Sequence, residues 1–383
     1  MPPNPLSSRI LIGTALLGVV ALAVFGIVHS SYDSASVPAS FVSAPHSAHL
    51  HRIDVHTHLS LGALPQLFSL MDRFDFAHVV DLSGSSPDGR LAGHLAQAVA
   101  SNGRVSVFMT FPVHELLSPG FGDRIASQLA RAKDMGVKGF KIPKGLGLGY
   151  EDPGGNLLAV DDARLDPVFD ACARLDLPVA IHVADPKAFW LPADQNNERS
   201  EELAVHPGWS FYGQPVPSWS ELLDALERRI ARHPHTTFIS VHFGNAAEDP
   251  DRVARMLRAY PNLFIDTAAR IPEFGRHSPE KMRAFFVEFQ DRILYGTDLG
   301  VGVEPFDLML GSSGPDLPSA TDVARFFTSS YRYFETADRN FESPTPIQGR
   351  WTISGIDLPP SVLRKIYGDN ARRLLHLVSA SAP

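Results

Sequence analysis

Eight short apolar runs, rich in β-branched and aromatic residues, recur along the chain from residue 52 onward. Each is four to seven residues long, which is typical of a strand that is buried on both faces. The predicted strands are Arg52–His56, Ala77–Leu82, Val105–Phe111, Gly139–Pro143, Pro178–Val183, Thr237–Val241, Leu263–Thr267 and Ile293–Gly296.

Most of these runs are separated by segments in which apolar residues repeat at helical spacing. In Arg124–Met135, for example, Ile125, Leu129 and Ala132 fall on one side. Alternating strands and helices imply parallel strands joined by right-handed crossovers, and eight such units predict a (β/α)8 TIM-type barrel. A doubly wound open sheet is the alternative. The other helical segments are Leu165–Leu175, Ser220–Ile230 (with Ser218 or Ser220 as its cap), Arg252–Tyr260 and Lys281–Phe289.

Two connections are too long to be simple turns. Asp185–Ser218 follows the fifth predicted strand, and Gly300–Pro359 follows the eighth. Loops after the strands of a barrel surround the active site, so these segments could form a substrate lid. Alternatively, they could cover the end of the barrel or dock a second subunit. Their aromatic residues include Trp209, Tyr212, Tyr331, Tyr333, Phe334 and Trp351.

The amino-terminal part of the chain has a different pattern. Ile10–Val28 is an uncharged run of 19 residues, about long enough to cross a hydrocarbon core of roughly 30 Å. We predict that residues 1–30 form a transmembrane anchor, or a signal peptide cleaved near Ser34–Ser36, and that residues 31–50 are a linker. A buried core helix is the remaining interpretation of the run. Because Arg9 precedes it, the expected location is the cell envelope: membrane-anchored outside the cytoplasm, or secreted or periplasmic after cleavage.

Composition narrows the classes of function and metal site. The net charge of −8 gives no basic surface for nucleic acid. Cys172 is the only cysteine, so a metal ion would be bound by histidine and carboxylate rather than by a thiolate cluster. Residues 51–377 suit one large domain. A small-molecule substrate is the expected partner, and a homo-oligomer is possible.

Histidines and one aspartate mark the ends of the predicted strands. His56 and His58 are two residues apart on the first strand, so both side chains project from one face, as two ligands of one metal ion require. His182, His242 and Asp298 lie at or just past the ends of the fifth, sixth and eighth strands. Barrel closure would gather these residues at one mouth. The remaining histidines, including His78, His94, His206, His233 and His235, are interpreted as surface or hydrogen-bonded residues.

Imidazole and carboxylate ligands suit Zn²⁺, Mn²⁺, Fe²⁺ or Co²⁺. A divalent ion with an open coordination position lowers the pKa of bound water toward about 7. In this interpretation Asp298 accepts a proton from the water and later returns it to the leaving group. His242 polarises a substrate oxygen or stabilises an oxyanion.

Five motifs, in this order, resemble the amidohydrolase superfamily. The similarity is greatest to the amidohydrolase-related (amidohydrolase 2) branch, which includes enzymes like aminocarboxymuconate semialdehyde decarboxylase, and it covers about residues 51–377. The motifs are Ile-Asp-Val-His-Thr-His at 53–58, Ile-His-Val-Ala-Asp at 181–185, Val-His-Phe-Gly-Asn at 241–245, Leu-Tyr-Gly-Thr-Asp at 294–298 and Ile-Tyr-Gly-Asp-Asn-Ala-Arg-Arg-Leu-Leu at 366–375.

The resemblance implies a distorted barrel with one divalent ion, usually zinc. Its ligands would be His56, His58, His182 and Asp298, while His242 would activate water or bind substrate. Two-metal members of the superfamily carry a carboxylated lysine on the fourth strand, where this chain has Lys141.

The basic residues near the strand ends allow other interpretations. If Lys141 forms a carbamate, His182 and His242 could bind a second ion. Lys141 and Lys144 could instead bind an anionic substrate, or be solvated at the rim. Arg270 and Arg276 could bind a substrate carboxylate, or be structural.

These observations favour a metal-dependent hydrolase that acts on an amide, lactone or ester of a small molecule. One alternative is a metal-dependent non-oxidative decarboxylase with the same ligands, because the branch contains both kinds of enzyme. A third interpretation is a non-catalytic, membrane-tethered binding module that has kept the barrel.

Overall fold

The computed structural model describes residues 50–112, 118–152, 154–312, 314 and 316–377. The predicted anchor or signal segment, 1–30, and the linker up to residue 49 lie outside the described residues, so both stay predictions. In the part of the chain that is described, no helix combines the length and apolar character needed to span a membrane.

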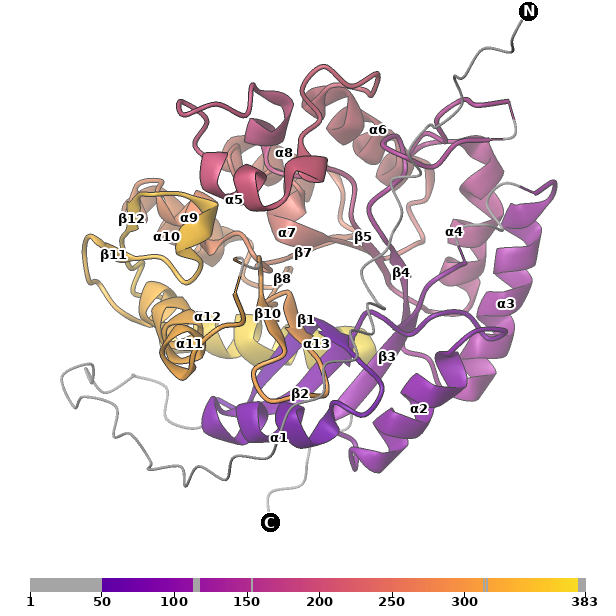
Figure 1. Ribbon diagram of the computed structural model, residues 1–383. Coiled ribbons are helices and arrows are strands. Elements are labelled where there is room, and N and C mark those ends of the chain that lie inside the picture. The colour runs from indigo at the N-terminus through magenta and orange to yellow at the C-terminus, as the bar shows by residue number, and fades with distance from the viewer. Residues whose placement is uncertain (1–49, 113–117, 153, 313, 315, 378–383) are drawn as a thin grey trace, which may run out of the picture. The chain divides into compact units, whose positions relative to one another are not determined.

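Ten strands form one curled sheet in the order β10-β9-β1-β2-β3-β4-β5-β6-β7-β8 (Figure 1). Neighbouring strands from β1 to β8 are parallel, as are β1 and β9, whereas β10 is antiparallel to β9. The strands are β1 Arg52–Leu59, β2 Phe76–Asp81, β3 Val105–Met109, β4 Gly139–Ile142, β5 Val179–Ile181, β6 Phe238–Ser240, β7 Leu263–Asp266, β8 Ile293–Leu294, β9 Leu299–Val301 and β10 Leu308–Leu310.

The sheet curls until the chain after β8 reaches β1. Val55 N donates to Tyr295 O at 3.0 Å, and Asp298 N donates to His56 O at 2.9 Å. The predicted TIM-type α/β fold is confirmed at this level. The doubly wound alternative is wrong, because the strand order from β1 to β8 follows the chain without a reversal. The sheet has ten strands rather than eight because β9 makes the regular ladder with β1 and carries β10 at its edge.

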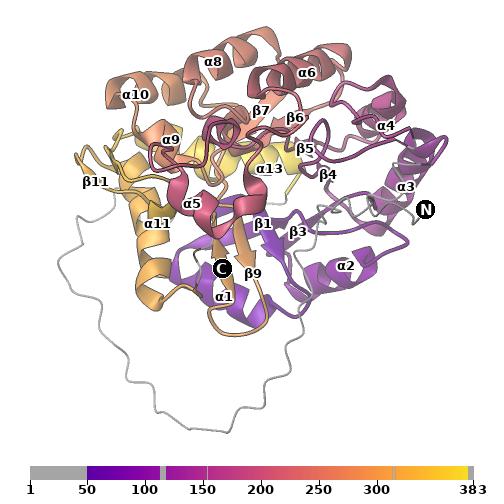
Figure 2. The same cartoon turned by 45° about the horizontal axis from the view of Figure 1, so that its top comes forward.

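Helices surround the strands (Figures 1 and 2). The helices that follow β1 to β7 include α1 Leu64–Arg73, α2 Leu91–Ala100, α3 Phe121–Met135, α4 Asp166–Arg174, α5 Ser200–Val205, α6 Trp219–Arg232, α7 Val241–Gly244, α8 Pro250–Ala259, α9 Ile271–Gly275 and α10 Pro279–Glu288. After β8 come α11 Ala320–Glu335, α12 Pro360–Arg364 and α13 Asn370–Leu375, a π turn at Lys365–Asp369, and the small pair β11 Phe341–Glu342 and β12 Thr352–Ile353. Short 3-10 helices span Ala163–Leu165, Lys187–Trp190, Pro207–Trp209 and Pro346–Gln348.

Capping residues set the helix starts. Ser218 accepts a hydrogen bond from the backbone of Glu221, whose side chain accepts from the backbone of Ser218, so α6 begins at Trp219. Ser218 is therefore the cap, as one of the two sequence candidates predicted. Helix α10 begins at Pro279, earlier than predicted, because Ser278 caps it and proline is well tolerated at the first helical position.

Two clusters of buried apolar residues form the core. The larger one joins the strands to the helices around them, as with Val107 of β3 and Leu129 of α3. The smaller one combines strand residues such as Val80 and Ile239 with Leu375 of α13. Burial of both strand faces explains why the strands read as continuous apolar runs rather than as alternating patterns.

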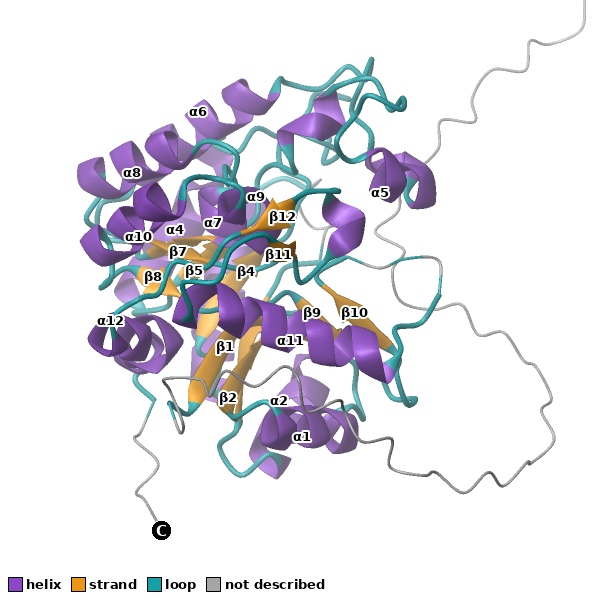
Figure 3. Cartoon of the chain, turned by 90° about the vertical axis from the view of Figure 1, so that its left-hand side faces the viewer, coloured by secondary structure: helices purple, strands orange, loops and turns teal. Residues whose placement is uncertain are grey.

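The two long connections have secondary structure of their own. The connection after β5 contains α5 and two 3-10 helices, and the one after β8 contains β9, β10 and α11. In Figure 3, α5 and the β9–β10 pair lie toward one end of the molecule and α12 toward the other. Tyr333 and Phe334 are fully buried, so the lid interpretation is wrong for these two aromatics: they pack in the core.

Candidate metal centre

His56 is almost completely buried in the site. Its ring is 1% exposed, and Nδ1 lies 2.8 Å from Asp266 Oδ2. Burial lowers the pKa of His56 well below the usual histidine value, so the ring is neutral. A neutral ring that donates from Nδ1 to a carboxylate leaves the Nε2 lone pair free. That Nε2 atom lies 3.3 Å from Asp298 Oδ1.

His58, two residues further along β1, lies at the open side of the same centre. Its Nδ1 lies 2.8 Å from Ser83 Oγ, and its Nε2 lies 3.4 Å from Asp298 Oδ1. Its side chain is 33% exposed, whereas that of His56 is 1% exposed. The two-residue spacing therefore brings both imidazoles to one carboxylate, as the sequence predicted.

His242 is held in a left-handed turn directly after β6. His242, Phe243 and Asn245 have positive φ angles of 54°, 57° and 58°. Such angles are uncommon outside glycine and are concentrated at functional sites. The turn is held in part by a hydrogen bond of 2.7 Å from His242 N to Asp266 Oδ1.

The ring of His242 is neutral and has a defined tautomer. Its Nδ1 lies 3.0 Å from Ala268 O, and a carbonyl oxygen can only accept a hydrogen bond. Burial lowers the pKa of His242 well below its usual value. The remaining nitrogen, Nε2, therefore presents a lone pair.

His182, after β5, packs against His242 with ring centroids 4.3 Å apart. Its Nε2 lies 3.2 Å from Ala184 O and 3.5 Å from Asp185 Oδ1. Because the carbonyl can only accept, Nε2 carries the proton, and Nδ1 is the nitrogen available to a ligand. Burial lowers the pKa of His182 to about 4, although Asp185 opposes the change.

Asp298 has a positive φ angle of 64°. Burial raises the pKa of its carboxyl group, but the hydrogen bond with His58 and the charge of Lys141 help to bring the pKa below the usual aspartate value. The carboxylate is therefore ionised at neutral pH and lies between the two histidines of β1. The structure brings together all five residues predicted from the strand ends.

The donor atoms fit a divalent cation. One ligand atom each from His56, His242 and Asp298 lie within 4.8 Å of one another. Two imidazole nitrogens and a carboxylate oxygen suit Zn²⁺ and its first-row neighbours. His242, predicted as a catalytic residue, thus joins the candidate ligands, while His58 and His182 flank this group. The ligand set predicted from the sequence stays a prediction.

Two buried aspartates in the site were not predicted. Asp266, at the end of β7, accepts from His56 Nδ1 and from the backbone of His242. Asp54 accepts from the backbone of His56 at 3.0 Å and from the Thr297 hydroxyl at 2.5 Å. Burial raises the pKa of Asp54 to about 7 and that of Asp266 to about 6. Asp266 ends the apolar run Leu-Phe-Ile-Asp, so the criterion that selected Asp298 could also have found it.

The predicted basic residues differ in their surroundings. Lys141 on β4 is 4% exposed, and Lys144 pairs with Asp185 while its side chain is 31% exposed. Arg270 is 7% exposed and donates to Ala269 O at 2.9 Å. Arg276 is engaged at 2.6 and 3.3 Å by the two carboxylate oxygens of Glu198. Of the two arginines considered for binding a substrate carboxylate, Arg276 is therefore already occupied.

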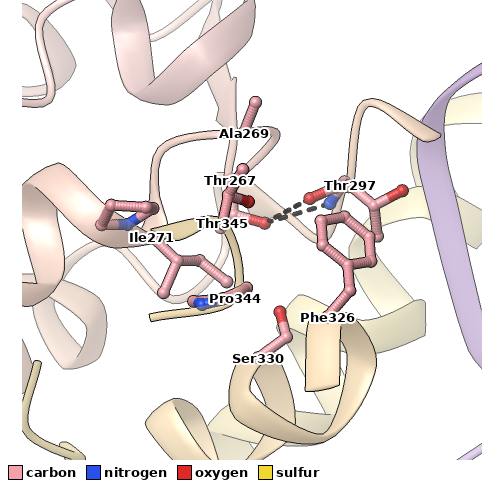
Figure 4. A pocket seen from close by; sticks show the side chains of 10 residues that line it. Thr267, Ala269, Ile271, Thr297, Phe326, Ser330, Pro344 and Thr345 are labelled. Atoms are coloured by element: carbon pink, nitrogen blue, oxygen red, sulfur yellow. Dashed lines mark hydrogen bonds between the residues drawn. The ribbon is translucent and has the colours of Figure 1, made fainter. Parts of the chain in front are cut away.

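A small cavity is lined by residues that follow β7 and β8 and by Phe326 and Ser330 of α11 (Figure 4). Its volume of about 10 Å³ has room for roughly one water molecule. On one wall, Thr267 Oγ1 donates to Gly296 O at 3.0 Å and accepts from Gly296 N at 3.1 Å, which ties the chain after β7 to the chain after β8. The cavity is too small for a substrate, and no histidine of the site lines it.

The fold and the site define the class of protein: a TIM-type α/β protein with histidines and a carboxylate clustered at its strand ends. Within that class, the chain belongs to the amidohydrolase family: the family model, described as Amidohydrolase, matches residues 53–377. The resemblance drawn from the five motifs is thereby confirmed. No curated protein matches the chain in sequence.

Several solved structures share the fold. A putative amidohydrolase from Staphylococcus aureus has 15% sequence identity and a TM-score of 0.51, with 85% of this chain and 99% of that chain covered. The 2,6-dihydroxybenzoate decarboxylase from Rhizobium has 17% identity and a TM-score of 0.50, with 85% and 98% covered. An uncharacterised TIM-barrel protein from Bordetella bronchiseptica has 14% identity and a TM-score of 0.50, with the same coverage. At these identities the likeness shows the fold alone.

Proposed function

We propose that the protein is a metal-dependent hydrolase that acts on the carbonyl of a small amide, lactone or ester. The observation that carries this proposal is the convergence of two neutral imidazoles and one ionised carboxylate within 4.8 Å. For both imidazoles, the Nδ1 proton is used in a hydrogen bond, so Nε2 is the free nitrogen.

Bound by His56, His242 and Asp298, with His58 and His182 beside them, a divalent cation, expected to be a single Zn²⁺, would supply Lewis-acid activation of water. Asp266 would orient His56 by accepting its Nδ1 proton and would also fix the His242 turn through the backbone. Such supporting contacts commonly set the orientation and basicity of metal-binding histidines.

Asp298 is suited to hold and move the proton. Its carboxylate is ionised, its side chain is 13% exposed, and it lies beside His56 and His58. It could accept a proton from the attacking water and return it to the leaving group. The site is open here, because the side chain of His58 is 33% exposed.

His242 is better suited to bind a cation than to donate a proton. Polarising a substrate oxygen requires a proton on Nε2, but the Nδ1 proton is committed to Ala268 O. A doubly protonated ring would satisfy both contacts, and burial opposes that form. The role first inferred for His242, as a donor to an oxyanion, is therefore the less favoured of its two roles.

Decarboxylation is the second candidate function. The observation that favours it is a pair of buried basic groups near the histidines, Lys141 and Arg270, neither of which forms an ion pair within the described residues; such groups suit a carboxylated substrate. The Rhizobium protein of the same fold is a decarboxylase by name, and its likeness extends to the fold alone.

One experiment separates these functions. The purified protein, with its metal content measured, is incubated in ¹⁸O-labelled water with a panel of lactones, amides, esters and carboxylated aromatics. Hydrolysis places ¹⁸O in the product acid, whereas decarboxylation releases carbon dioxide. The variant Asp298→Asn should lose turnover, and Asp251→Asn, a change at a surface carboxylate paired with Lys281, should keep it. If no metal supports any turnover, the protein is a binding module rather than an enzyme.

A further inference from the structure

Lys141 is a buried cation without a partner. Its side chain projects from β4, the residue is 4% exposed, and Nζ has no hydrogen-bond partner among the described residues. It also forms no ion pair in the described part of the chain. An unpaired ammonium in such a place is costly, so its retention calls for a ligand that is absent from the folded chain itself.

The charge of Lys141 acts on the centre of the site. Burial is the main cause that lowers the pKa of His56, His182 and His242, and the charge of Lys141 adds to it. Burial also lowers the pKa of Lys141 itself, while Asp266 and Asp298 oppose that change. In the strand ladder Lys141 is paired with Ala180 of β5, and His182 N donates to Ile142 O at 3.0 Å, so the backbone of Lys141 lies beside the β5 segment that carries His182.

The nearby carboxylates are already committed. Asp266 accepts hydrogen bonds from His56 Nδ1 and from the backbone of His242 and Ala268. Asp298 Oδ1 lies 3.4 Å from His58 Nε2, and Asp298 is one of the three candidate metal ligands. The three donors of the Lys141 ammonium are left for a molecule that enters the site.

The strand order places a second cation on the other side of the same histidines. Lys141 is on β4 and Arg270 follows β7, while His182 and His242 belong to the two strands between them. Arg270 is buried, makes no ion pair within the described residues, and its charge also lowers the pKa of His242. The β4–β7 side of the mouth therefore carries two buried cations, together with the carboxylates of Asp185 and Asp266, which are bound within the chain. The β1–β8 side carries His56, His58 and Asp298.

We propose that Lys141 binds a negatively charged group of an organic acid beside the His182–His242 pair. The substrate would then lie with its anionic group toward β4–β7 and its reacting bond toward β1 and β8. This assignment gives the substrate class of the proposed enzyme, an organic acid, and therefore rests on the proposed function. Binding of the acid can nevertheless be measured without turnover. Burial brings the pKa of Lys141 down to about 8, which still leaves the ammonium form in excess at neutral pH.

The test is calorimetric binding of two anions and their neutral isosteres to the purified protein. Acetate is compared with nitromethane, and benzoate with nitrobenzene, because each nitro compound has nearly the shape of its anion and lacks the net charge. We expect at least one anion to bind more tightly than its isostere. Lys141→Met should weaken binding of that anion by roughly 30-fold or more and leave the affinity for the isostere unchanged. Lys281→Met, which removes a surface lysine, is the matched control and should bind as the wild type does.

The variant should fold, because methionine replaces an unpaired buried charge by an apolar chain of similar length. Lys141→Gln is the second variant. If neither variant folds, the affinities of the wild type for each anion and its neutral isostere decide whether the site binds an anion. Failure of both anions to bind the wild type, or equal anion binding by Lys141→Met, would refute the assignment. A carbamate signal in ¹³C-bicarbonate NMR that disappears in Lys141→Met would also overturn it, because Lys141 would then be anionic. None of these readouts depends on turnover, so an inactive protein that still prefers anions would refute only the proposed enzyme function.

Discussion

Asp266→Asn is the sharpest test of the proposed centre, because one carboxylate supports two histidines. Asp266 Oδ2 lies 2.8 Å from His56 Nδ1, and Oδ1 accepts from the backbone of His242 at 2.7 Å and of Ala268 at 3.1 Å. Asparagine keeps an oxygen for the two backbone donors but turns an NH₂ group toward His56. The substitution therefore reverses the direction of the hydrogen bond with His56 and leaves the turn in place.

The expected magnitude follows from these contacts. An amide that donates to Nδ1 favours the tautomer of His56 with its proton on Nε2, which blocks the proposed ligand atom. Loss of such a supporting carboxylate typically lowers metal affinity by roughly 10–100-fold, or about 1.4–2.7 kcal/mol. Asp266→Ala would also leave three buried donors without an acceptor. It should lower the free energy of unfolding by about 3–5 kcal/mol, a large share of the roughly 5–15 kcal/mol typical of a domain.

Zinc affinity is measured by competition with a fluorescent chelator, the tautomer of His56 by long-range ¹⁵N NMR of the ring, and stability by urea unfolding. We expect Asp266→Asn to bind zinc more weakly, with stability close to that of the wild type. Asp251→Asn is the control, because its carboxylate contacts only the surface lysine Lys281 in the described structure. If Asp266→Asn binds zinc as tightly as the wild type and keeps the Nδ1 proton on His56, the reasoning about the centre is wrong.

Three further predictions concern the metal and the fold. Chelation should lower the melting temperature and re-addition of zinc should restore it, because a ligand that binds only the folded state stabilises that state. An unchanged melting curve would contradict the proposed metal site. Burial lowers the pKa of His78 to about 4, so the unfolded state takes up a proton near pH 6.5 before the folded state does. His78 should therefore cost the wild type up to about 3 kcal/mol of stability as the pH falls from 6.5 to 4, and urea unfolding of His78→Asn should show a flatter pH dependence in that window. Arg199 is fully buried against Glu202 and Glu273. Arg199→Met should lower the free energy of unfolding by about 3–5 kcal/mol, because it leaves two buried carboxylates unpaired. A loss under about 1 kcal/mol would show that the cluster is not charged.

The other histidines were interpreted as surface or hydrogen-bonded residues; His233 is buried and hydrogen-bonded, His235 is exposed, and His78 and His94 are two further cases. His78 lies 2.8 Å from both Gly103 O and Ser106 Oγ, and His94 Nδ1 lies 2.7 Å from Asp81 Oδ2. Both are buried, hydrogen-bonded residues, as predicted. The presence of a histidine therefore says little about whether it belongs to the metal centre, whereas its position at a strand end says much more.

The sequence by itself determined the alternation of strands and helices and the five polar residues at the strand ends. These follow from local patterns: apolar runs mark buried strands, and parallel strands place their carboxyl ends at one edge. The spacing of His56 and His58 was enough to predict that both would face one site. The extra pair β9 and β10 was not predicted, because Gly300 interrupts the first run and the second lies inside the segment interpreted as one long connection.

Only the tertiary structure decided which nitrogen of each imidazole is free and which charges are paired. His56 and Asp266 are 210 residues apart in sequence, and their hydrogen bond fixes the tautomer of the histidine. Likewise, the sequence left Lys141 open between a carbamate, an anion-binding group and a solvated residue at the rim. Its burial without a hydrogen-bond partner emerges only from the tertiary structure. Hydrophobic periodicity records which residues leave water, whereas protonation and pairing depend on the groups that distant segments bring beside them in a medium of low dielectric constant.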